Sequence, residues 1–460
     1  MAGNREVKAL GPSYHLSDRK AAVQRSVNWY LAKVDGLGED TELRLKQCDG
    51  LDLVHDFNAP VRGIWDAEGR LFVVAGSTLY EWVSASMVSR GTLATSTGYV
   101  SMADGQEQLC IVDGPNGYVL NLTTNVFAQI LSAGWLGSNH VEHLDGYFLF
   151  VDPGTEVFYI SAIDDASNLD ALDFSSADSQ PDRIITHRVR KREAYFFGST
   201  SCEVWINSGS PDFPLSRYNG TPIDVGCVGQ NAVAVAADTL YWVGQTARGK
   251  GIVYEMQGYQ PVRVSTDAVE EALAESTDLS GCYVWGYQTR GAEFVAIKAP
   301  GLSSTWVFDA ATRQWHERAE WDGDWTQFRV EQVAFSQSTH YAIGGDSLYM
   351  FNGESNQIAG AAMLRERTWP HLRLPSLEPV SYRGLELLCT TGQGSGLITL
   401  QISNDGGYNY GATLTRSLGV TGRWMQRVRW LALGTATDRV FRLRVSDNVR
   451  VDLNAATLDV

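Results

Sequence analysis

The sequence predicts an all-β protein, a β-propeller of six or seven blades followed by a small C-terminal antiparallel β-sandwich. The 460 residues include 45 glycines, 14 tryptophans and 19 tyrosines, and apolar residues almost never recur with the period of a helix. A unit of three strands repeats along most of the chain. After Phe351 the sequence changes and contains strand breakers. These three observations predict the fold class and its division into two domains.

The repeat defines the first domain. In each copy an apolar strand, a turn and a β-branched or aromatic strand precede a Gly-bearing hairpin and a third strand with an aromatic residue. The copies cover residues 61–82, 99–122, 140–160, 184–206, 232–255, 283–308 and 330–351. The third-strand aromatic residues are Tyr80, Tyr118, Tyr159, Trp205, Tyr254, Trp306 and Tyr349, at spacings of 38 to 52 residues. This period is typical of a propeller blade, and ring closure covers the apolar face of each blade. A pair of β-sandwiches is the alternative.

Residues 1–25 are expected to form an N-terminal arm, and residues 26–365 are expected to form the propeller. Two further elements are expected within the propeller. The segment Glu42–Lys46 alternates like a strand and is expected to return and complete the last blade. One helix is expected after a cap at Ser265 or Thr266. Acidic residues favour its first turn, and Val269, Ala272 and Leu273 form a short apolar stripe.

The second domain is expected over residues 375–460. Residues 365–370 and 374–379 carry breakers that suit a crossing between domains. The strands that follow are expected at residues 384–389, 397–403, 411–414, 426–433 and 440–445. About 85 residues of this kind predict a small antiparallel sandwich.

Composition and charge exclude several functions. Lys and Arg total 37 against 53 Asp and Glu, so the formal charge is −16, which argues against stable nucleic-acid binding through phosphate contacts. The apolar runs are too short to span a bilayer, and residues 1–6 contain no apolar signal core. We therefore expect no membrane insertion and no secretory signal. The six cysteines lie far apart and are expected to be buried thiols formed in a reducing cytosol.

Residues with catalytic or metal-binding chemistry are sparse. His140 and His143 flank Glu142, but positions i and i+3 of a strand point to opposite faces, so the pair is unsuited to one metal ion. Asp178 and Asp182 bracket Gln180-Pro181 and are interpreted as a turn. Residues 403–410 approximate the Asp-box hairpin of sialidase propellers, which stabilises a turn. No nucleotide-binding or hydrolase motif is present. We therefore expect no enzyme activity, metal or cofactor.

Two groups of basic residues are candidate interaction sites. Arg188, Arg190, Lys191 and Arg192 form a dense run that is either a solvated strand end or a contact with an acidic partner or passing DNA. Near the C-terminus, eight arginines and no lysine fall between residues 416 and 450. Alternation places Arg427 and Arg429 opposite Val428 and Trp430, and Arg442 and Arg444 opposite Leu443 and Val445. These four arginines are expected to form one cationic ladder for a subunit or partner interface. The alternative is pairing with Asp405, Asp438 and Asp447 in the same domain.

Short stretches over most of the chain match sequence motifs of one protein family, and they occur in the same order as in that family. They are residues 26–30 (SVNWY) with Leu43-Arg44 and Asp49-Gly50-Leu51, residues 176–182, 197–199, 203–205, 263–266 with 268–270, and the C-terminal stretches 400–407, 427–430, 433–434 and 441–446. Together they resemble the packaged-DNA stabilisation proteins of short-tailed bacteriophages, also called tail hub or nozzle proteins. In the first stretch Cys48-Asp49 stands where Pro often precedes the glycine.

The resemblance implies a structural virion protein without enzyme activity. Such a hub forms a ring, most commonly a hexamer, below the portal and its head-to-tail adaptor. It closes the DNA channel, retains packaged DNA, and anchors tail spikes, fibres or a needle. Double-stranded DNA passes it during ejection without sequence readout. Its location is the virion tail, after assembly in the host bacterial cytoplasm. A glycan-binding or glycan-cleaving, sialidase-like propeller is the alternative function.

Overall fold

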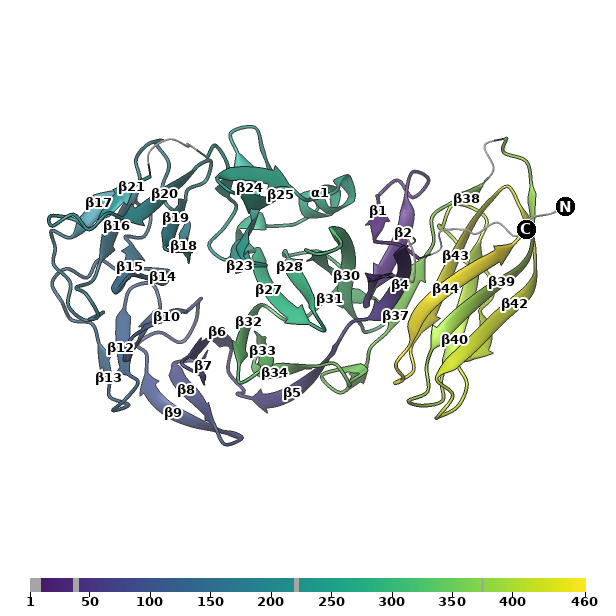
Figure 1. The fold of residues 1–460 in the computed structure, drawn as a ribbon, viewed down its shortest axis with the longest axis horizontal. Helices are drawn as coiled ribbons and strands as arrows, with labels where there is room; N and C mark the ends of the chain where they lie inside the picture. The colour runs from purple at the N-terminus through teal and green to yellow at the C-terminus, as the bar shows by residue number, and fades with distance from the viewer. Residues whose placement is uncertain (1–9, 36–40, 219–222, 374–375) are drawn as a thin grey trace.

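The computed structural model describes residues 10–35, 41–218, 223–373 and 376–460. Seven antiparallel sheets surround a common axis, and a β-sandwich lies at one end of the long axis of the molecule (Figure 1). The propeller and the sandwich both agree with the predicted all-β fold class. No helix in the described ranges is long and apolar enough to cross a membrane.

The blades follow the chain in order. Blade 1 contains β6 (Val61–Ala67), β7 (Arg70–Ala75), β8 (Thr78–Val83) and β9 (Ser86–Thr92), and blade 2 contains β10 (Ser101–Gly105), β11 (Gln108–Val112), β12 (Gly117–Asn121) and β13 (Phe127–Gln129). Blade 3 contains β14 (Val141–Leu144), β15 (Tyr147–Val151), β16 (Val157–Ile160) and β17 (Phe174–Ser176), and blade 4 contains β18 (Thr186–Arg190), β19 (Glu193–Phe197), β20 (Cys202–Asn207) and β21 (Leu215–Arg217). Blade 5 contains β22 (Gly226–Cys227), β23 (Val233–Ala236), β24 (Thr239–Thr246), β25 (Gly249–Gln257) and β26 (Gln260–Arg263), and blade 6 contains β27 (Tyr283–Thr289), β28 (Ala292–Lys298), β29 (Thr305–Asp309) and β30 (Gln314–Trp321), with β31 (Trp325–Gln327) on β30.

Blade 7 closes the ring with an N-terminal strand. It consists of β32 (Gln332–Ser336), β33 (Thr339–Gly344), β34 (Ser347–Asn352) and β5 (Gly50–Asp56), with the short strands β35 (Gln357–Ile358) and β36 (Ala361–Ala362) beyond β5. The expectation that Glu42–Lys46 completes the last blade is therefore wrong, because β5 pairs with β34. Both segments alternate like strands, so alternation could not tell which one reaches the blade. The innermost strands of adjacent blades contact one another around the whole ring.

The sandwich combines both ends of the chain. One sheet has the order β3 (Trp29–Asp35), β4 (Thr41–Gln47), β44 (Asp452–Asp459), β39 (Val380–Thr390) and β42 (Met425–Ala436). The other runs through β37 (Arg365–Thr368), β43 (Asp438–Val445), β40 (Leu397–Ser403) and β41 (Leu414–Ser417), with β38 (Leu372–Arg373) on β43. Trp29 and Leu45 share one buried core with Trp430 and Phe441.

The structure therefore places the domain limits differently from the expected 1–25, 26–365 and 375–460. The strands β3 and β4 pair within the sandwich, and residues 365–368 form its strand β37 instead of a crossing. In the expected arm, β1 (Tyr14–His15) pairs with β2 (Val23–Val27), and β2 lies between β30 and β37. Residues 1–9 and 374–375 lie outside the described ranges. A continuous sheet consequently runs from blade 6 through β2 into the sandwich.

Several local predictions are confirmed. Each predicted third-strand aromatic residue lies in the third strand of its blade, from Tyr80 in β8 to Tyr349 in β34. The expected helix is α1 (Asp267–Ala274), and it buries Val269 and Leu273. Thr266 occupies its N-cap position, but its side chain makes no capping hydrogen bond. A single 3₁₀ turn, η1 (Leu279–Gly281), follows. All six cysteines are buried and free.

Candidate functional site

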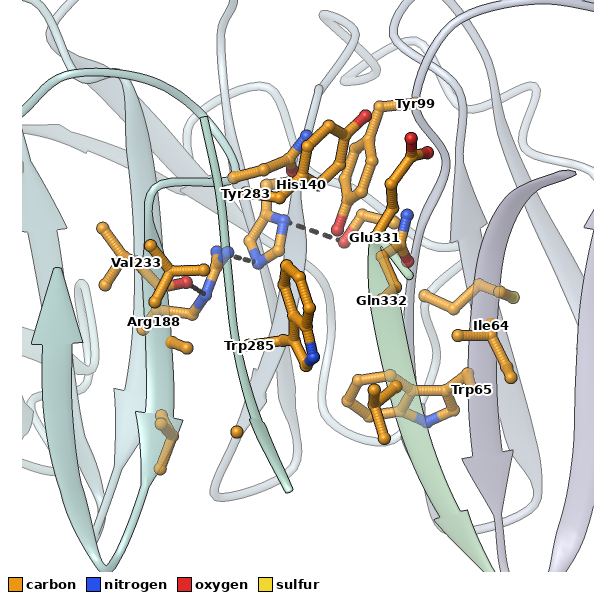
Figure 2. A pocket seen from close by; sticks show the side chains of 18 of the residues that line it. Ile64, Trp65, Tyr99, His140, Arg188, Val233, Tyr283, Trp285, Glu331 and Gln332 are labelled. Carbon is orange, nitrogen blue, oxygen red and sulfur yellow. Dashed lines mark hydrogen bonds between the residues drawn. The ribbon is translucent and has the colours of Figure 1, made fainter. Parts of the chain in front are cut away.

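All seven blades line a cavity on the propeller axis. Its volume is about 380 Å³, and every blade contributes residues from its innermost strand or from the residues just before it (Figure 2). Aromatic side chains, among them Tyr99, Tyr283 and Trp285, face charged groups from other blades (Figure 2). The repeat therefore brings residues from all seven blades together at the cavity.

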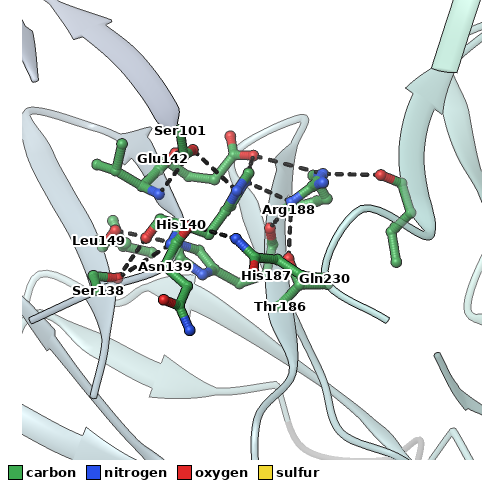
Figure 3. A network of polar contacts seen from close by, with 12 residues as sticks. Ser101, Ser138, Asn139, His140, Glu142, Leu149, Thr186, His187, Arg188 and Gln230 are labelled. Atoms are coloured by element: carbon green, nitrogen blue, oxygen red, sulfur yellow. Dashed lines mark hydrogen bonds and ion pairs between the residues drawn. The ribbon is translucent and has the colours of Figure 1, made fainter. Parts of the chain in front are cut away.

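A hydrogen-bond chain in the cavity wall crosses four blades (Figure 3). Arg188 of β18 donates to Nε2 of His140, and Nδ1 of the same ring is hydrogen-bonded to the Ser101 hydroxyl of β10 at 3.0 Å. Arg188 also donates to the backbone carbonyls of His187 at 2.7 Å and Val233 of β23 at 3.1 Å. The chain thus links blades 2, 3, 4 and 5 through one guanidinium group.

Burial sets the charge of this network. Burial and the neighbouring guanidinium lower the pKa of His140 well below its ordinary value, so the ring is neutral. Burial raises the pKa of Glu142, whose carboxylate lies 3.0 Å from His140 Nε2, while Arg188 opposes that rise. Because Arg188 is buried and its hydrogen-bond partners come from different blades, we interpret the network as a structural connection between blades.

His140 and His143, which flank Glu142 in the sequence, point in different directions, as their spacing on a strand indicated. His140 lines the cavity, whereas the His143 ring packs against Phe148 at 5.0 Å between centroids. In the described part of the chain, no three His, Cys, Asp or Glu side chains are grouped for a metal ion.

The structure divides the basic run at residues 188–192. Arg188 is buried and faces the cavity, so the expected contact with DNA or an acidic partner is wrong for this residue. The other three lie in or near the turn after β18. Arg190 donates to the Asp238 carbonyl, Lys191 pairs with the Asp238 carboxylate, and Arg192 donates to Asp145 at 2.8 Å. These contacts link the turn to blades 3 and 5. A partner contact stays a hypothesis for Arg190, Lys191 and Arg192.

The four C-terminal arginines lie on two different sheets, so the single ladder expected for them is wrong. Arg427 and Arg429 project from β42 into solvent and share the carboxylate of Glu386 on β39. The apolar side of each strand faces the core as predicted, because Val428, Trp430, Leu443 and Val445 are buried.

Arg442 and Arg444 have local partners on β43. Arg442 donates to Gln401 at 2.6 Å and stacks over the Tyr410 ring at 3.6 Å. Arg444 donates to Glu366 at 2.7 Å, and Glu366 is almost fully buried. The alternative pairing with Asp405, Asp438 and Asp447 is not the arrangement observed. Asp405 instead accepts the backbone N–H of Asn409 at 3.0 Å and stabilises the predicted turn.

Sequence reasoning missed a buried ionic cluster beside the sandwich. Glu317 of β30 has no exposed surface and accepts hydrogen bonds from Arg25, Ser13 and Ser304. His15 lies 3.3 Å from the same carboxylate. These residues are up to about 300 positions apart in the sequence, so no local sequence pattern could predict the cluster.

Comparison with known families also separates a propeller from a sandwich. Residues 38–329 match the family described as bacteriophage P22 Gp10, beta-propeller, and residues 367–460 match bacteriophage P22 Gp10, beta-sandwich. The two matches cover more than half of the chain in the expected order. The chain belongs to the bacteriophage P22 Gp10 family. This is the packaged-DNA stabilisation, or tail hub, family that the sequence resembles, and its members are structural components of the phage tail.

More distant comparisons add little to the family match. No curated protein matches the sequence. A chain of the mitotic checkpoint complex is 11% identical, with a TM-score of 0.44, covering 70% of this chain and 98% of that one. A chain from a S. cerevisiae assembly of dbp5, nup159 and gle1 is 8% identical, with a TM-score of 0.43, covering 76% and 99%. At this level neither structure bears on function.

In this Gp10-family chain, residues 176–182 and 197–199, two of the stretches that match family motifs, are in contact. Asp182, at the end of residues 176–182, accepts the backbone N–H groups of Ser199, Thr200 and Ser201 at 2.6 to 3.0 Å. These bonds outweigh burial and lower the pKa of Asp182. Asp182 therefore stabilises the turn between β19 and β20, and not a turn of its own segment as expected from the sequence.

Proposed function

We propose that six copies of this chain form a ring that serves as the tail hub of a short-tailed phage. The ring sits below the portal and its adaptor, closes the DNA channel to retain packaged DNA, and anchors spikes, fibres or a needle. The observation that carries the proposal is the match of both Gp10 domains in order on one chain. The continuous sheet between blade 6 and the sandwich supports it, because a hub under DNA pressure requires rigidly joined domains.

The charge of the chain suits passage of DNA. A net charge of −16 opposes adhesion of a like-charged duplex, and a channel requires transit more than affinity. The same charge opposes association of free subunits at low salt, so the subunit is expected to stay soluble until the portal and adaptor present a template. Assembly in the host cytoplasm agrees with six free cysteines.

Electron microscopy of the purified protein mixed with portal and adaptor tests this function. We expect a closed ring attached to the adaptor, with a copy number of six in intact tails by mass measurement. A complex without bound protein, or a copy number that no ring allows, would contradict the hub.

Absence of catalysis is the second part of the proposal. Arg188 and His140 are engaged with each other, and Glu331 at the cavity is paired with Lys298 at 2.9 Å. A sialidase-like propeller would require two free carboxylic groups facing one pocket. Turnover on a panel of glycoside substrates would contradict this part. A stoichiometric transition metal in chelator-washed protein would also contradict it.

A further inference from the structure

Charge is divided unequally between the two ends of the molecule. Residues 365–460 contain twelve arginines, no lysine and eight carboxylates, for a net charge of +4. The other 364 residues contain 25 basic and 45 acidic residues, for a net charge of −20. A basic sandwich attached to an acidic propeller has opposite charges available for contacts between copies.

The basic charge gathers beside exposed apolar side chains at the edge of one sandwich sheet. We define the β42 patch as Arg416, Arg423, Arg427, Arg429, Val420, Trp424, Met425 and Leu431. Trp424, Met425 and Leu431 are each more than 60% exposed. Arg427 and Arg429 share the single carboxylate of Glu386, so one positive charge remains uncompensated at that point. β42 is also the last strand of its sheet.

An acidic and apolar surface lies on the third blade. We define the blade 3 patch as Asp164, Asp165, Asp170, Asp173, Asp178, Ile163, Leu172, Phe174 and Leu131. Residues 161–182 contain six aspartates and no basic residue. Within the described ranges none of the five aspartates of the patch forms an ion pair. Burial and the neighbouring Asp170 raise the pKa of Asp173. Leu172 is 80% exposed, and Leu131 is 83% exposed.

Neighbouring segments hold the blade 3 patch together. The Ser132 hydroxyl donates to the Leu169 carbonyl at 2.8 Å, which places the segment after β13 against the loop between β16 and β17. This contact places the segment that carries Leu131 against the loop that carries Leu172 and most of the aspartates of the patch. Exposed apolar groups at such density are typical of a protein contact.

The two patches cannot meet within one chain. β16 and β17 lie at one end of the long axis, and β42 lies at the other (Figure 1). Contact between them requires a second copy, and a head-to-tail contact of this kind generates a ring when its rotation closes. Exposed Trp, Met and Leu side chains among arginines favour a protein partner over DNA, whose phosphates offer them no apolar surface.

We propose that the β42 patch of each subunit docks on the blade 3 patch of the next subunit. This inference rests on the proposed ring and identifies the surfaces that build it. Arginines of one copy meet aspartates of the next around an apolar centre formed by Trp424, Leu431, Leu172 and Phe174. The opposite charges of the two patches act locally against the net repulsion between acidic subunits, and they select head-to-tail over like-with-like pairing.

A charge-exchange experiment tests the contact on the ring assembled with portal and adaptor. One variant carries R427E with R429E, and the other carries D170K with D173K. Each variant alone places like charges at every contact, so neither should form the ring. In a mixture, each altered patch meets an oppositely charged patch on the other variant. We therefore expect an alternating ring with equal numbers of both variants, seen by native mass spectrometry.

Control variants distinguish loss of this contact from misfolding and from a general effect of charge. R248E with K250E changes two basic residues on the exposed hairpin between β24 and β25, and this variant should assemble normally. Milder variants, R427Q with R429Q and D170N with D173N, should form fewer rings and retain the wild-type thermal unfolding.

Three outcomes would overturn the contact. In the first, either exchanged variant assembles like wild type. In the second, the mixture stays unassembled. In the third, only the arginine variant fails, which would assign the β42 patch to the adaptor or to DNA. Wild-type protein that forms no ring would refute the proposed function as well, whereas a wild-type ring with inert exchanges would refute only this contact.

Discussion

Replacement of Glu317 by glutamine should destabilise the protein more than any single surface substitution. Glu317→Gln keeps the shape of the side chain and removes its charge. The Arg25 guanidinium, which contacts both carboxylate oxygens at 2.6 to 3.0 Å and is only 16% exposed, is then left without its main counter-charge. Breaking a buried pair on one side costs about 3–5 kcal/mol. Two charge-assisted hydrogen bonds at about 1.5–3 kcal/mol each give a similar sum of about 3–6 kcal/mol.

Urea unfolding followed by tryptophan fluorescence measures this cost. With a denaturant slope of about 3 kcal/mol/M for a chain of this size, the midpoint should fall by on the order of 1 M. Glu354→Gln is the matched control, because its carboxylate is 76% exposed and pairs with Arg290 at 3.3 Å. This control should unfold like wild type. A midpoint for Glu317→Gln equal to that of Glu354→Gln would refute the reasoning.

The same cluster predicts a pH dependence. Burial alone would raise the pKa of Glu317, but Arg25 and His15 outweigh it and hold the pKa well below its ordinary value. A carboxyl group with a lowered folded-state pKa stabilises the protein above its unfolded pKa of about 4.3 and loses that contribution as the pH falls. The difference between wild type and Glu317→Gln should therefore be constant from pH 7 to about pH 5 and shrink below about pH 4.

Three further substitutions test the contacts that hold the blades and the sandwich together. Gly198→Ala would place a Cβ atom 2.4 Å from the Asp182 carboxylate, and it should lower the free energy of unfolding in urea by about 1–3 kcal/mol. Gly249→Ala is the control, because an added Cβ atom there meets no atom within 4 Å, and it should change the free energy of unfolding by less than about 0.5 kcal/mol. Arg188→Leu removes a donor that bonds residues of blades 3, 4 and 5 and should lower the free energy of unfolding by about 3 kcal/mol. Arg192→Gln at the exposed turn should leave thermal unfolding unchanged, and equal effects of the two substitutions would contradict the structural role of Arg188. Arg444→Gln leaves buried Glu366 without its nearest cation and should cost about 2 kcal/mol, whereas Arg427→Gln should leave the subunit as stable as wild type in the same assay.

The sequence by itself determined the blades and much of the sandwich. A propeller blade is an antiparallel meander whose strands are neighbours along the chain, so alternation, turns and the recurring aromatic residue are sufficient to locate it. The strand expected at residues 397–403 matches β40, and the turn around Asp405 forms from residues four apart. Local hydrogen bonds and short loops make such elements readable from one segment.

Only the tertiary structure decided which distant segments pair. Alternation predicts a strand at Glu42–Lys46, but the closed ring accepts β5, and the predicted strand joins the sandwich as part of β4. It likewise shows which side of β42 and β43 is apolar, yet the two strands lie in opposite sheets, so Arg427 and Arg442 face different surroundings. The sequence around Arg188 suggests an exposed cation, but in the structure Arg188 is buried at the cavity that all seven blades line. Pairing between remote strands depends on the whole packed geometry, and a periodicity that repeats every two residues carries no information about the partner.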